Sequence, residues 1–289
     1  MDNSNTIYDR ITDLICEKLE NGTNPWKKPF TSPGIFPMNL VSKRPYSGIN
    51  SFILQCSGFN SPFFLTYNQV KTLGGNVKKG ERSTPIIFWK FIESGKSKKD
   101  LTEETGSTKR IPLLKHFNVF NIEQTEGIPE KDITPVENFK REFSPIEDAE
   151  KIVTGYKNGP EIIYGKEGAY YAPMRDMIGM PDKNCFTSDS NFYSVLFHEM
   201  GHSTGHKNRL NRIEPGTAPF GSVKYSFEEL VAEMTASFLC GCCGFENETI
   251  DNSVAYLKGW ASNLRNNPKW MVQASGKAQR AADFIQGIS

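Results

Sequence analysis

The sequence predicts an α+β protein of two modules. In the front half, apolar residues recur at helical spacing in some segments and form short strand-like runs in others, whereas two helical patterns dominate the back half. The charge differs as well. Residues 1–127 hold 17 Lys and Arg against 12 Asp and Glu, a net of +5, and residues 128–289 hold 17 against 21, a net of −4. With 289 residues the chain has ample material for two cores. We therefore expect an N-terminal module over 1–127, a linker over 128–144 and a second module over 145–289.

The elements of the front module follow from periodicity and turn residues. Apolar residues from Ile7 to Leu19 recur at helical spacing, which predicts an amphipathic opening helix that stops near Asn21. The later pattern predicts, in order, a strand over 63–66, a short helix over 67–73, a turn over 76–82, a strand over 84–91 and a closing strand over 116–122. The charged stretch 94–108 is expected to be a mobile hairpin tip, and the Pro-, Glu- and Lys-rich stretch before residue 145 is typical of a linker.

The back half contains an H-E-x-x-H motif at His198-Glu-Met-Gly-His202. On a helix, residues four apart lie on one face about a turn apart, so both imidazoles can meet a single ion. Glu199 lies one position further round, where it can hold a metal-bound water and take its proton. A bare motif of this kind also arises by chance. Here the apolar lead-in suits a buried helix, and Gly205 can end it. The pattern predicts a Zn²⁺ site, with another divalent metal as an alternative.

Such a site needs a third protein ligand. His206 lies eight residues after His198, about 12 Å along a continuous helix, and is too far away to share the ion. A second helical pattern over 225–239 carries three glutamates. Glu229 and Glu233 share a face, so we assign Glu229 as the ligand and Glu233 as the acceptor of a hydrogen bond from a ligating imidazole. The opposite assignment stays open, and Glu228 is expected to point into solvent.

The cysteines and the hydropathy exclude other classes of protein. Six cysteines, three of them clustered in Cys240-Gly-Cys-Cys243, form no spaced disulfide framework. We expect buried reduced thiols, with a second metal site at the cluster as the less favoured alternative. The first residues are polar and acidic, and no apolar run approaches the length of a membrane span. The sequence therefore indicates a cytoplasmic protein that does not bind membranes.

The front module carries a basic stretch that contains aromatic residues. From residue 66 to residue 100 there are eight Lys and Arg against three Asp and Glu. Aromatic rings can stack on bases while cations meet phosphates, a pattern that suits single-stranded DNA. The candidate contacts are Lys71, Lys78, Lys79, Arg82, Tyr67 and Trp89. Composition alone favours a plainer interpretation, because basic turns are usually solvated and alternating aromatics usually belong to a core.

Several motifs in order resemble one family. In the front half these are Asn24-Pro-Trp-Lys-Lys-Pro, Tyr46-Ser-Gly-Ile-Asn, the run 65–81 and Phe117-Asn-Val-Phe-Asn-Ile-Glu-Gln. In the back half they are the run 170–181, the run 198–212 and Glu228-Glu-Leu-Val-Ala-Glu. They are similar to ArdC-type antirestriction proteins over nearly the whole chain. One departure is Ser203, where the resemblance leads us to expect a bulky aromatic residue.

The resemblance implies a single-stranded-DNA-binding N-terminal domain and a zincin-like, gluzincin-type C-terminal metallopeptidase domain. It also implies carriage on conjugative plasmids or other mobile genetic elements, where such proteins protect incoming DNA from host restriction. In zincin folds an edge strand above the metal pairs with the substrate peptide, and 176–181 is the segment that we expect there. The candidates for stabilising the oxyanion are Tyr170, Tyr171, His206 and Tyr225.

Two hypotheses of different class follow. In the first, the protein is a DNA-tethered metallopeptidase that cleaves a host protein met on DNA. In the second, it is a DNA-binding shield whose metal site is structural or vestigial. A purely structural site would not need Glu199, and structural zinc usually has four protein ligands, where we count three. The pattern therefore favours catalysis.

Overall fold

The computed structural model describes residues 6–22, 36–93, 110–129, 133, 145–213, 223–245, 247 and 254–288. The expected hairpin tip over 94–108, the motif that begins at Asn24 and most of the expected linker lie outside the described residues. The other expected elements of the front half are present. The opening helix is α1 (Ile7–Glu20), which begins at a capping box in which the Thr6 and Asp9 side chains each bond the other's backbone.

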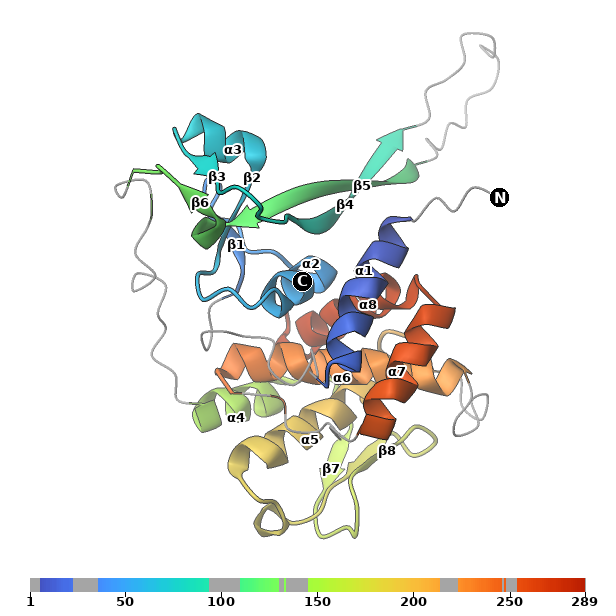
Figure 1. The fold of residues 1–289 in the computed structure, drawn as a ribbon. Helices are drawn as coiled ribbons and strands as arrows, with labels where there is room; N and C mark the ends of the chain where they lie inside the picture. Colours follow the sequence, from blue (N-terminus) through green and yellow to red (C-terminus); the bar gives the residue numbers. More distant parts are fainter. Residues whose placement is uncertain are drawn as a thin grey trace, which may run out of the picture.

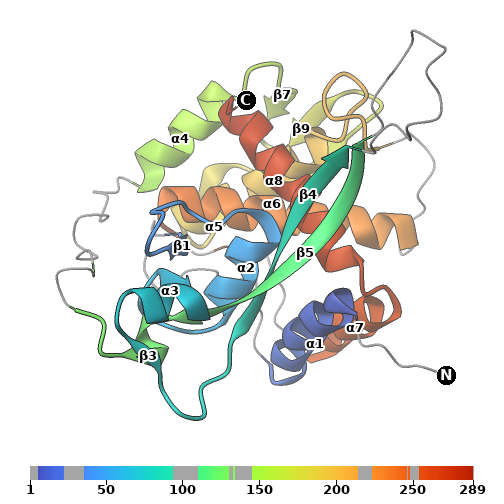
Figure 2. The same cartoon turned by 90° about the horizontal axis from the view of Figure 1, so that it is seen from above.

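A four-stranded sheet forms one end of the molecule (Figure 1). Its strand order is β1-β2-β5-β4, with β1 parallel to β2 and the remaining pairs antiparallel. The strands are β1 (Met38–Asn39), β2 (Phe63–Thr66), β4 (Thr84–Glu93) and β5 (Arg110–Asn121). The segments between them form α2 (Gly48–Cys56), α3 (Tyr67–Thr72), β3 (Asn76–Val77), η1 (Ile122–Gln124) and β6 (Thr125–Glu126). Seen from above, the long β4–β5 ribbon crosses over the helices (Figure 2).

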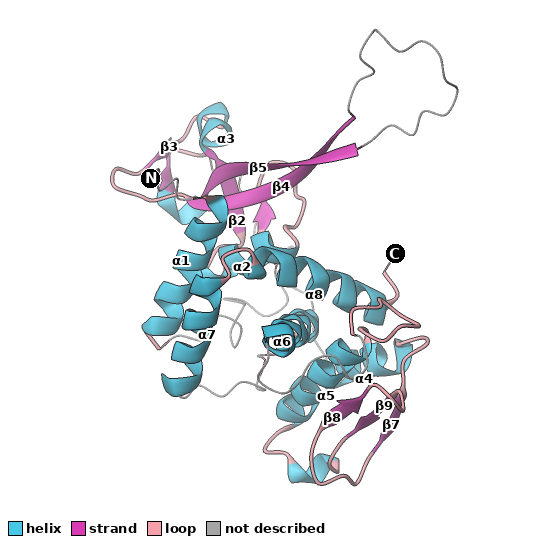
Figure 3. Cartoon of the chain, turned by 90° about the vertical axis from the view of Figure 1, so that its right-hand side faces the viewer, coloured by secondary structure: helices cyan, strands magenta, loops and turns pink. Residues whose placement is uncertain are grey.

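Helices make up most of the back half. They are α4 (Pro145–Gly155), α5 (Asp189–Ser203), α6 (Val223–Cys243), α7 (Val254–Asn266) and α8 (Trp270–Gln286). Figure 3 views α6 end-on, with α5, α7 and α8 around it. Leu230, Val231 and Met234 of α6 are fully buried, because this helix is covered on several sides. A helix in that position can hold a buried carboxylate against α5.

The main core crosses the expected boundary between the modules. Ile11 and Ile15 of α1 and Phe52 of α2 belong to the same buried cluster as α5, α6, α7 and α8. The hydroxyl of Thr12 donates to the carbonyl of Pro268 at 2.9 Å, a contact between the two ends of the chain. A fragment of residues 1–127 would therefore expose apolar side chains that the full chain buries.

The small sheet of the back half corrects our prediction of the edge strand. It contains β7 (Glu161–Ile163), β8 (Tyr170–Ala172) and β9 (Met177–Gly179), followed by η4 (Lys183–Cys185). The order is β7-β9-β8, so β9 is the central strand and the expected edge position of 176–181 is wrong. Residues 177–180 are all buried, as a strand with neighbours on both sides should be. The edges of this sheet are β7 and β8.

All six cysteines are free, as expected, but they are not all buried. Cys16, Cys240 and Cys243 are buried, whereas Cys185 in η4 is exposed, and the prediction of a buried thiol is wrong there. None of the helices in the described ranges is long and apolar enough to cross a membrane.

Candidate metal centre and nucleic-acid interface

Helix α5 places the two histidines of the H-E-x-x-H motif side by side. Its N-cap is Ser188, whose hydroxyl accepts a hydrogen bond from the Asn191 amide, and the helix runs from Asp189 to Ser203. The Nε2 atoms of His198 and His202 lie 3.1 Å apart. Two nitrogens that bind one tetrahedral zinc ion at ~2.0–2.1 Å are separated by roughly 3.3 Å. The imidazoles are thus preorganised for a shared ion.

Helix α6 supplies the carboxylate that completes the group. Glu229 lies with one oxygen 3.5 Å from His198 Nε2 and the other 3.3 Å from His202 Nε2. The three side chains bring one ligand atom each within 4.8 Å of one another, the only such group in the described part of the chain. Two imidazoles and a carboxylate are a fitting donor set for zinc or another divalent transition metal. The Cys240–Cys243 segment forms no such group.

The close approach of α5 and α6 makes this convergence feasible. A Cβ atom at Gly201 would lie 3.2 Å from the Ala232 Cα and 3.2 Å from the Thr235 Cβ, so a larger residue would fit only if α6 gave way by a few tenths of an ångström. Gly201 precedes His202 directly, and Ala232 lies three residues after Glu229. The glycine therefore sets the distance between the ligands of the two helices.

Glu233 lies at the outer side of His198. Its carboxylate is 3.7 Å from Nδ1 of His198, the ring nitrogen that points away from the ligand group, and this nitrogen is buried without a hydrogen-bond partner among the residues that the structure describes. This geometry favours the assignment made from the sequence, with Glu229 at the ion and Glu233 behind the imidazole.

Charges around the site shift the pKa values of its titrating groups. Burial alone would lower the pKa of His198, but the Glu233, Glu229 and Glu199 carboxylates outweigh it and raise that pKa well above 6.5. Burial opposes ionisation of Glu229, yet hydrogen bonds and the charge of the two histidines hold its pKa far below the usual range. The site is thus an anionic pocket that attracts a cation.

Glu228 does not point into solvent, so that prediction is wrong. Its carboxylate accepts two hydrogen bonds from the Arg212 guanidinium, at 2.7 and 3.3 Å, and its side chain is only 17% exposed. The same carboxylate lies 3.9 Å from Nδ1 of His202. Helical periodicity places Glu228 on a different face of the helix from Glu229. It could not show that Arg212, from another segment, would pair with Glu228 there.

The four candidates for an oxyanion donor occupy different surroundings. Tyr225 of α6 lies beside the ligand group. Burial, together with the nearby Glu229 and Glu199, raises its pKa to about 12, so its hydroxyl stays protonated. The Tyr171 hydroxyl instead donates to Asp176 at 2.8 Å, and Nδ1 of His206 lies 3.7 Å from the same carboxylate. Tyr170 is exposed at the edge strand β8.

Glu199 is buried on α5 between the two ligand histidines in sequence, with 8% of its surface exposed. Next to the second histidine, the hydroxyl of Ser203 donates to the Met200 carbonyl and lies 3.1 Å from the Tyr156 hydroxyl. Tyr156 thus places an aromatic side chain beside the position where the resemblance led us to expect one.

The expected DNA-binding residues lie on helix α3, in the turn between β3 and β4, and on strand β4. Tyr67 and Lys71 lie on α3, where Tyr67 is 51% exposed and the Lys71 ammonium is 5.7 Å from its ring. In the following turn Lys79 and Arg82 are exposed, and the Lys78 ammonium donates to the Glu123 carbonyl at 2.8 Å.

Trp89 lies on β4, paired with Leu114 of β5. On the same ribbon Phe88 and Phe117 are each 45% exposed, and their rings meet edge-to-face at 5.7 Å between centroids. Lys115 pairs with Phe88 across the strands and is exposed. Sequence reasoning did not select Phe117, because strand aromatics are usually core residues, and it did not select Lys115, which lies outside the basic stretch 66–100.

Comparison with known proteins agrees with this architecture. Residues 5–120 match the model for the N-terminal domain of anti-restriction factor ArdC, and residues 147–277 match a zincin-like metallopeptidase. The chain is 33% identical to DNA primase TraC of Escherichia coli over 96% of its own length but spans only 27% of that relative. It is 30% identical to the uncharacterized protein y4eC of Sinorhizobium fredii, covering 96% of this chain and 91% of that one.

Two solved structures of the antirestriction protein ArdC from plasmid R388 share the fold. The metal-free structure superposes with a TM-score of 0.72 at 32% identity, covering 98% of this chain and 97% of that one. The Mn(II)-bound structure gives 0.74 at 31% identity, covering 98% of each chain. Both domains, in the same order and over nearly the whole length, are those of one family. The chain therefore belongs to the ArdC family of antirestriction proteins, with a zincin-like domain in its C-terminal half.

Proposed function

We propose that this chain is an antirestriction protein of a mobile genetic element, that it binds single-stranded DNA, and that it carries a zinc-dependent peptidase site. The observation that carries the peptidase proposal is the convergence of His198, His202 and Glu229 on one point, with Glu199 on the same helix. Three protein ligands leave a coordination position for water or substrate. The substrate that we propose is a host protein encountered on the incoming DNA.

The side chains around the site can carry out peptide hydrolysis. A bound zinc ion would polarise the scissile carbonyl and lower the pKa of a water molecule. Glu199 then takes the proton of the attacking water and delivers it to the leaving amine. Tyr225, protonated because its pKa is raised to about 12, is the donor best placed among the four candidates to stabilise the oxyanion. The edge strand β8, rather than 176–181, is the strand available to a peptide on the α5 side of the sheet.

The Glu199→Gln variant separates a peptidase from a shield. Glutamine keeps the size of the side chain but cannot act as the general base, so the fold and metal content should persist. We expect the variant to lose protection of incoming DNA in cells that carry a restriction system, while it binds DNA like wild type. Full protection by a folded, metal-loaded Glu199→Gln protein would instead support the shield hypothesis, in which occupancy of the DNA is sufficient.

Exposed aromatic and basic side chains support single-stranded DNA as the partner. Phe88 and Phe117 present ring surface on the β4–β5 ribbon next to Lys115, and Tyr67 does so beside Lys71 on α3. Rings of this kind stack on bases without reading their identity, and the lysines can meet phosphates. The front half is also the basic half of the chain, with a net charge of +5 over residues 1–127.

The proposal that the protein binds single-stranded DNA is tested by measuring binding of the full chain to a labelled oligonucleotide. Replacing Lys78, Lys79 and Arg82 together with alanine should weaken DNA binding. The slope of log affinity against log salt concentration should become shallower by about 0.7 for each lost phosphate contact. Replacing Phe88 and Phe117 with alanine should weaken binding by ~1–3 kcal/mol per base stack with the slope unchanged. Metal content should not change in either variant. Binding by wild type that is indifferent to salt would contradict the proposal.

A further inference from the structure

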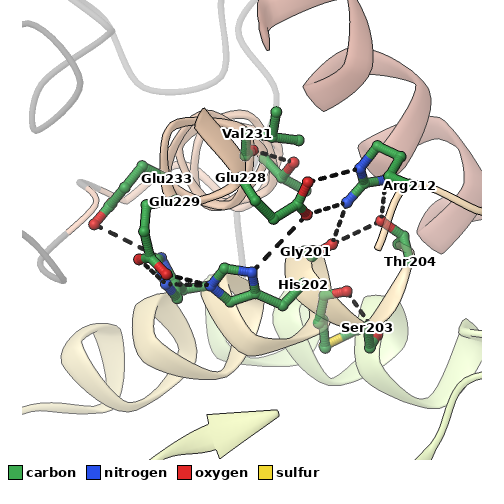
Figure 4. A network of polar contacts seen from close by, with 12 residues as sticks. Gly201, His202, Ser203, Thr204, Arg212, Glu228, Glu229, Val231 and Glu233 are labelled. Atoms are coloured by element: carbon green, nitrogen blue, oxygen red, sulfur yellow. Dashed lines mark hydrogen bonds and ion pairs between the residues drawn. The ribbon is translucent and has the colours of Figure 1, made fainter. Parts of the chain in front are cut away.

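The loop that follows α5 is tied to the metal centre by one arginine. Arg212 is only 6% exposed, and its guanidinium donates four hydrogen bonds. Two go to Glu228, one to the Thr204 hydroxyl at 2.8 Å and one to the Gly201 carbonyl at 3.0 Å (Figure 4). Gly201 belongs to the last turn of α5, where backbone carbonyls lack partners within the helix, and Thr204 is the C-cap of this helix. Arg212 thus joins the end of α5 to the start of the Glu228–Glu233 segment of α6.

The two ligand histidines have matching surroundings. Each directs Nε2 toward the ligand group, and each has a carboxylate near Nδ1, Glu233 at 3.7 Å from His198 and Glu228 at 3.9 Å from His202. Both distances exceed hydrogen-bond range by a few tenths of an ångström, which a small rotation of the imidazole can close. A carboxylate in this position fixes the tautomer and orientation of the ring and makes it a stronger ligand.

Glu228 can serve His202 only while it is held. A glutamate side chain has three rotatable bonds, and an unpaired carboxylate at this position would gain hydration by turning outward. The two-pronged bond from Arg212 fixes the plane of the carboxylate and keeps one oxygen directed at the imidazole. Lysine could not reproduce this, because an ammonium is a point charge.

We propose that Glu228 and Arg212 are positioning residues of the metal centre, with Arg212 holding Glu228 so that its carboxylate orients His202 for the ion. This rests on the proposed metal site. Neither residue touches the ion or the reacting atoms. Partners of this kind affect metal affinity by ~10–100-fold.

A second arginine of the same loop provides a matched control. Arg209 is 3% exposed, and its guanidinium, like that of Arg212, donates several hydrogen bonds. One goes to the Ser203 carbonyl at the end of α5, and the others go to the Asn158 carbonyl, to Asp176 and to the Tyr171 hydroxyl, in and around the small sheet. Loss of Arg209 should loosen the loop about as much as loss of Arg212, without freeing Glu228.

The experiment measures Zn²⁺ affinity of the full chain by competition with a chromophoric chelator, and unfolding temperature of the metal-free protein. We expect Arg212→Gln and Glu228→Met each to weaken Zn²⁺ binding by ~10–100-fold. Glu228→Gln, which keeps an acceptor oxygen toward His202, should recover most of the affinity. Arg209→Gln should lower the unfolding temperature yet change affinity by less than about threefold. The Arg212→Gln/Glu228→Met double variant should bind no worse than the weaker single variant, because both changes break one connection.

Several results would overturn the inference. Wild-type affinity in Glu228→Met, equal weakening by Arg209→Gln and Arg212→Gln, or additive losses in the double variant would each show that the arginine only anchors the loop. If Arg212→Gln fails to fold, the comparison of Glu228→Met with Glu228→Gln decides alone. Absence of Zn²⁺ binding by wild type would refute the proposed metal site itself, a result distinct from all of these.

Discussion

Replacing one residue of the N-terminal helix should destabilise the proposed metal centre in the back half of the chain. Ile15 of α1 is 1% exposed and belongs to the core shared with α5 and α6. Ile15→Ala removes three buried carbons at ~0.8 kcal/mol each, about 2.4 kcal/mol, and an unrelaxed cavity raises the loss toward ~5 kcal/mol. This is a large part of the ~5–15 kcal/mol by which domains are stable.

Leu14 provides the control on the same helix. It is 37% exposed and lies outside the shared core, so Leu14→Ala should cost only about 1 kcal/mol. The assay is urea unfolding of the zinc-loaded full chain, followed both by circular dichroism and by release of zinc to a chromophoric chelator. For Ile15→Ala we expect both signals to shift together to lower urea. If zinc release kept its wild-type midpoint while only part of the dichroism signal shifted, α1 would belong to a separately folding N-terminal module, and our reading of the shared core would be refuted.

Two further predictions concern the ligand assignment and acid stability. Elemental analysis should show that Glu229→Ala strips the metal, whereas Glu233→Ala only weakens it by ~10–100-fold; the reverse order would exchange their roles. Burial opposes ionisation of Asp176, but hydrogen bonds from Arg209 and Tyr171 hold its pKa below the ordinary 3.8. A lowered pKa contributes stability that is present above 3.8 and is lost as the pH falls through the lowered value. The stability difference between wild type and Asp176→Asn, from urea unfolding, should therefore be constant near neutral pH and shrink progressively as the pH falls below 3.8; a difference that stays constant as the pH falls below 3.8 would contradict this account.

Features that depend on local geometry were predictable from the sequence. The spacing of His198 and His202 places them on one helical face, because the pitch of a helix is a property of the backbone. Apolar periodicity located α1 for the same reason, since this helix shows one face to a core, whereas β2 was located by an unbroken apolar run that is buried on both faces.

Features that depend on neighbours were not predictable. Segment 176–181 looked like an edge strand, but whether a strand lies at an edge depends on what pairs with it, and β7 and β8 pair with both sides of β9. Likewise, α1 was assigned to the front module by its place in the chain, while its apolar face packs on α7 and the central core.

The ligand set illustrates the division most clearly. The sequence by itself placed the two proposed histidine ligands and the proposed general base together, because a single helix carries all three. It also put Glu229 and Glu233 on one face of a second helix, but it did not settle which of the two is the metal ligand. It gave Glu228 no role at the site. Only the docking of α6 on α5, at the close contact that Gly201 permits, decides that Glu229 meets both Nε2 atoms. The same docking brings Glu228 between Arg212 and His202, because a carboxylate's partners are set by the distance between elements and not by its position along one of them.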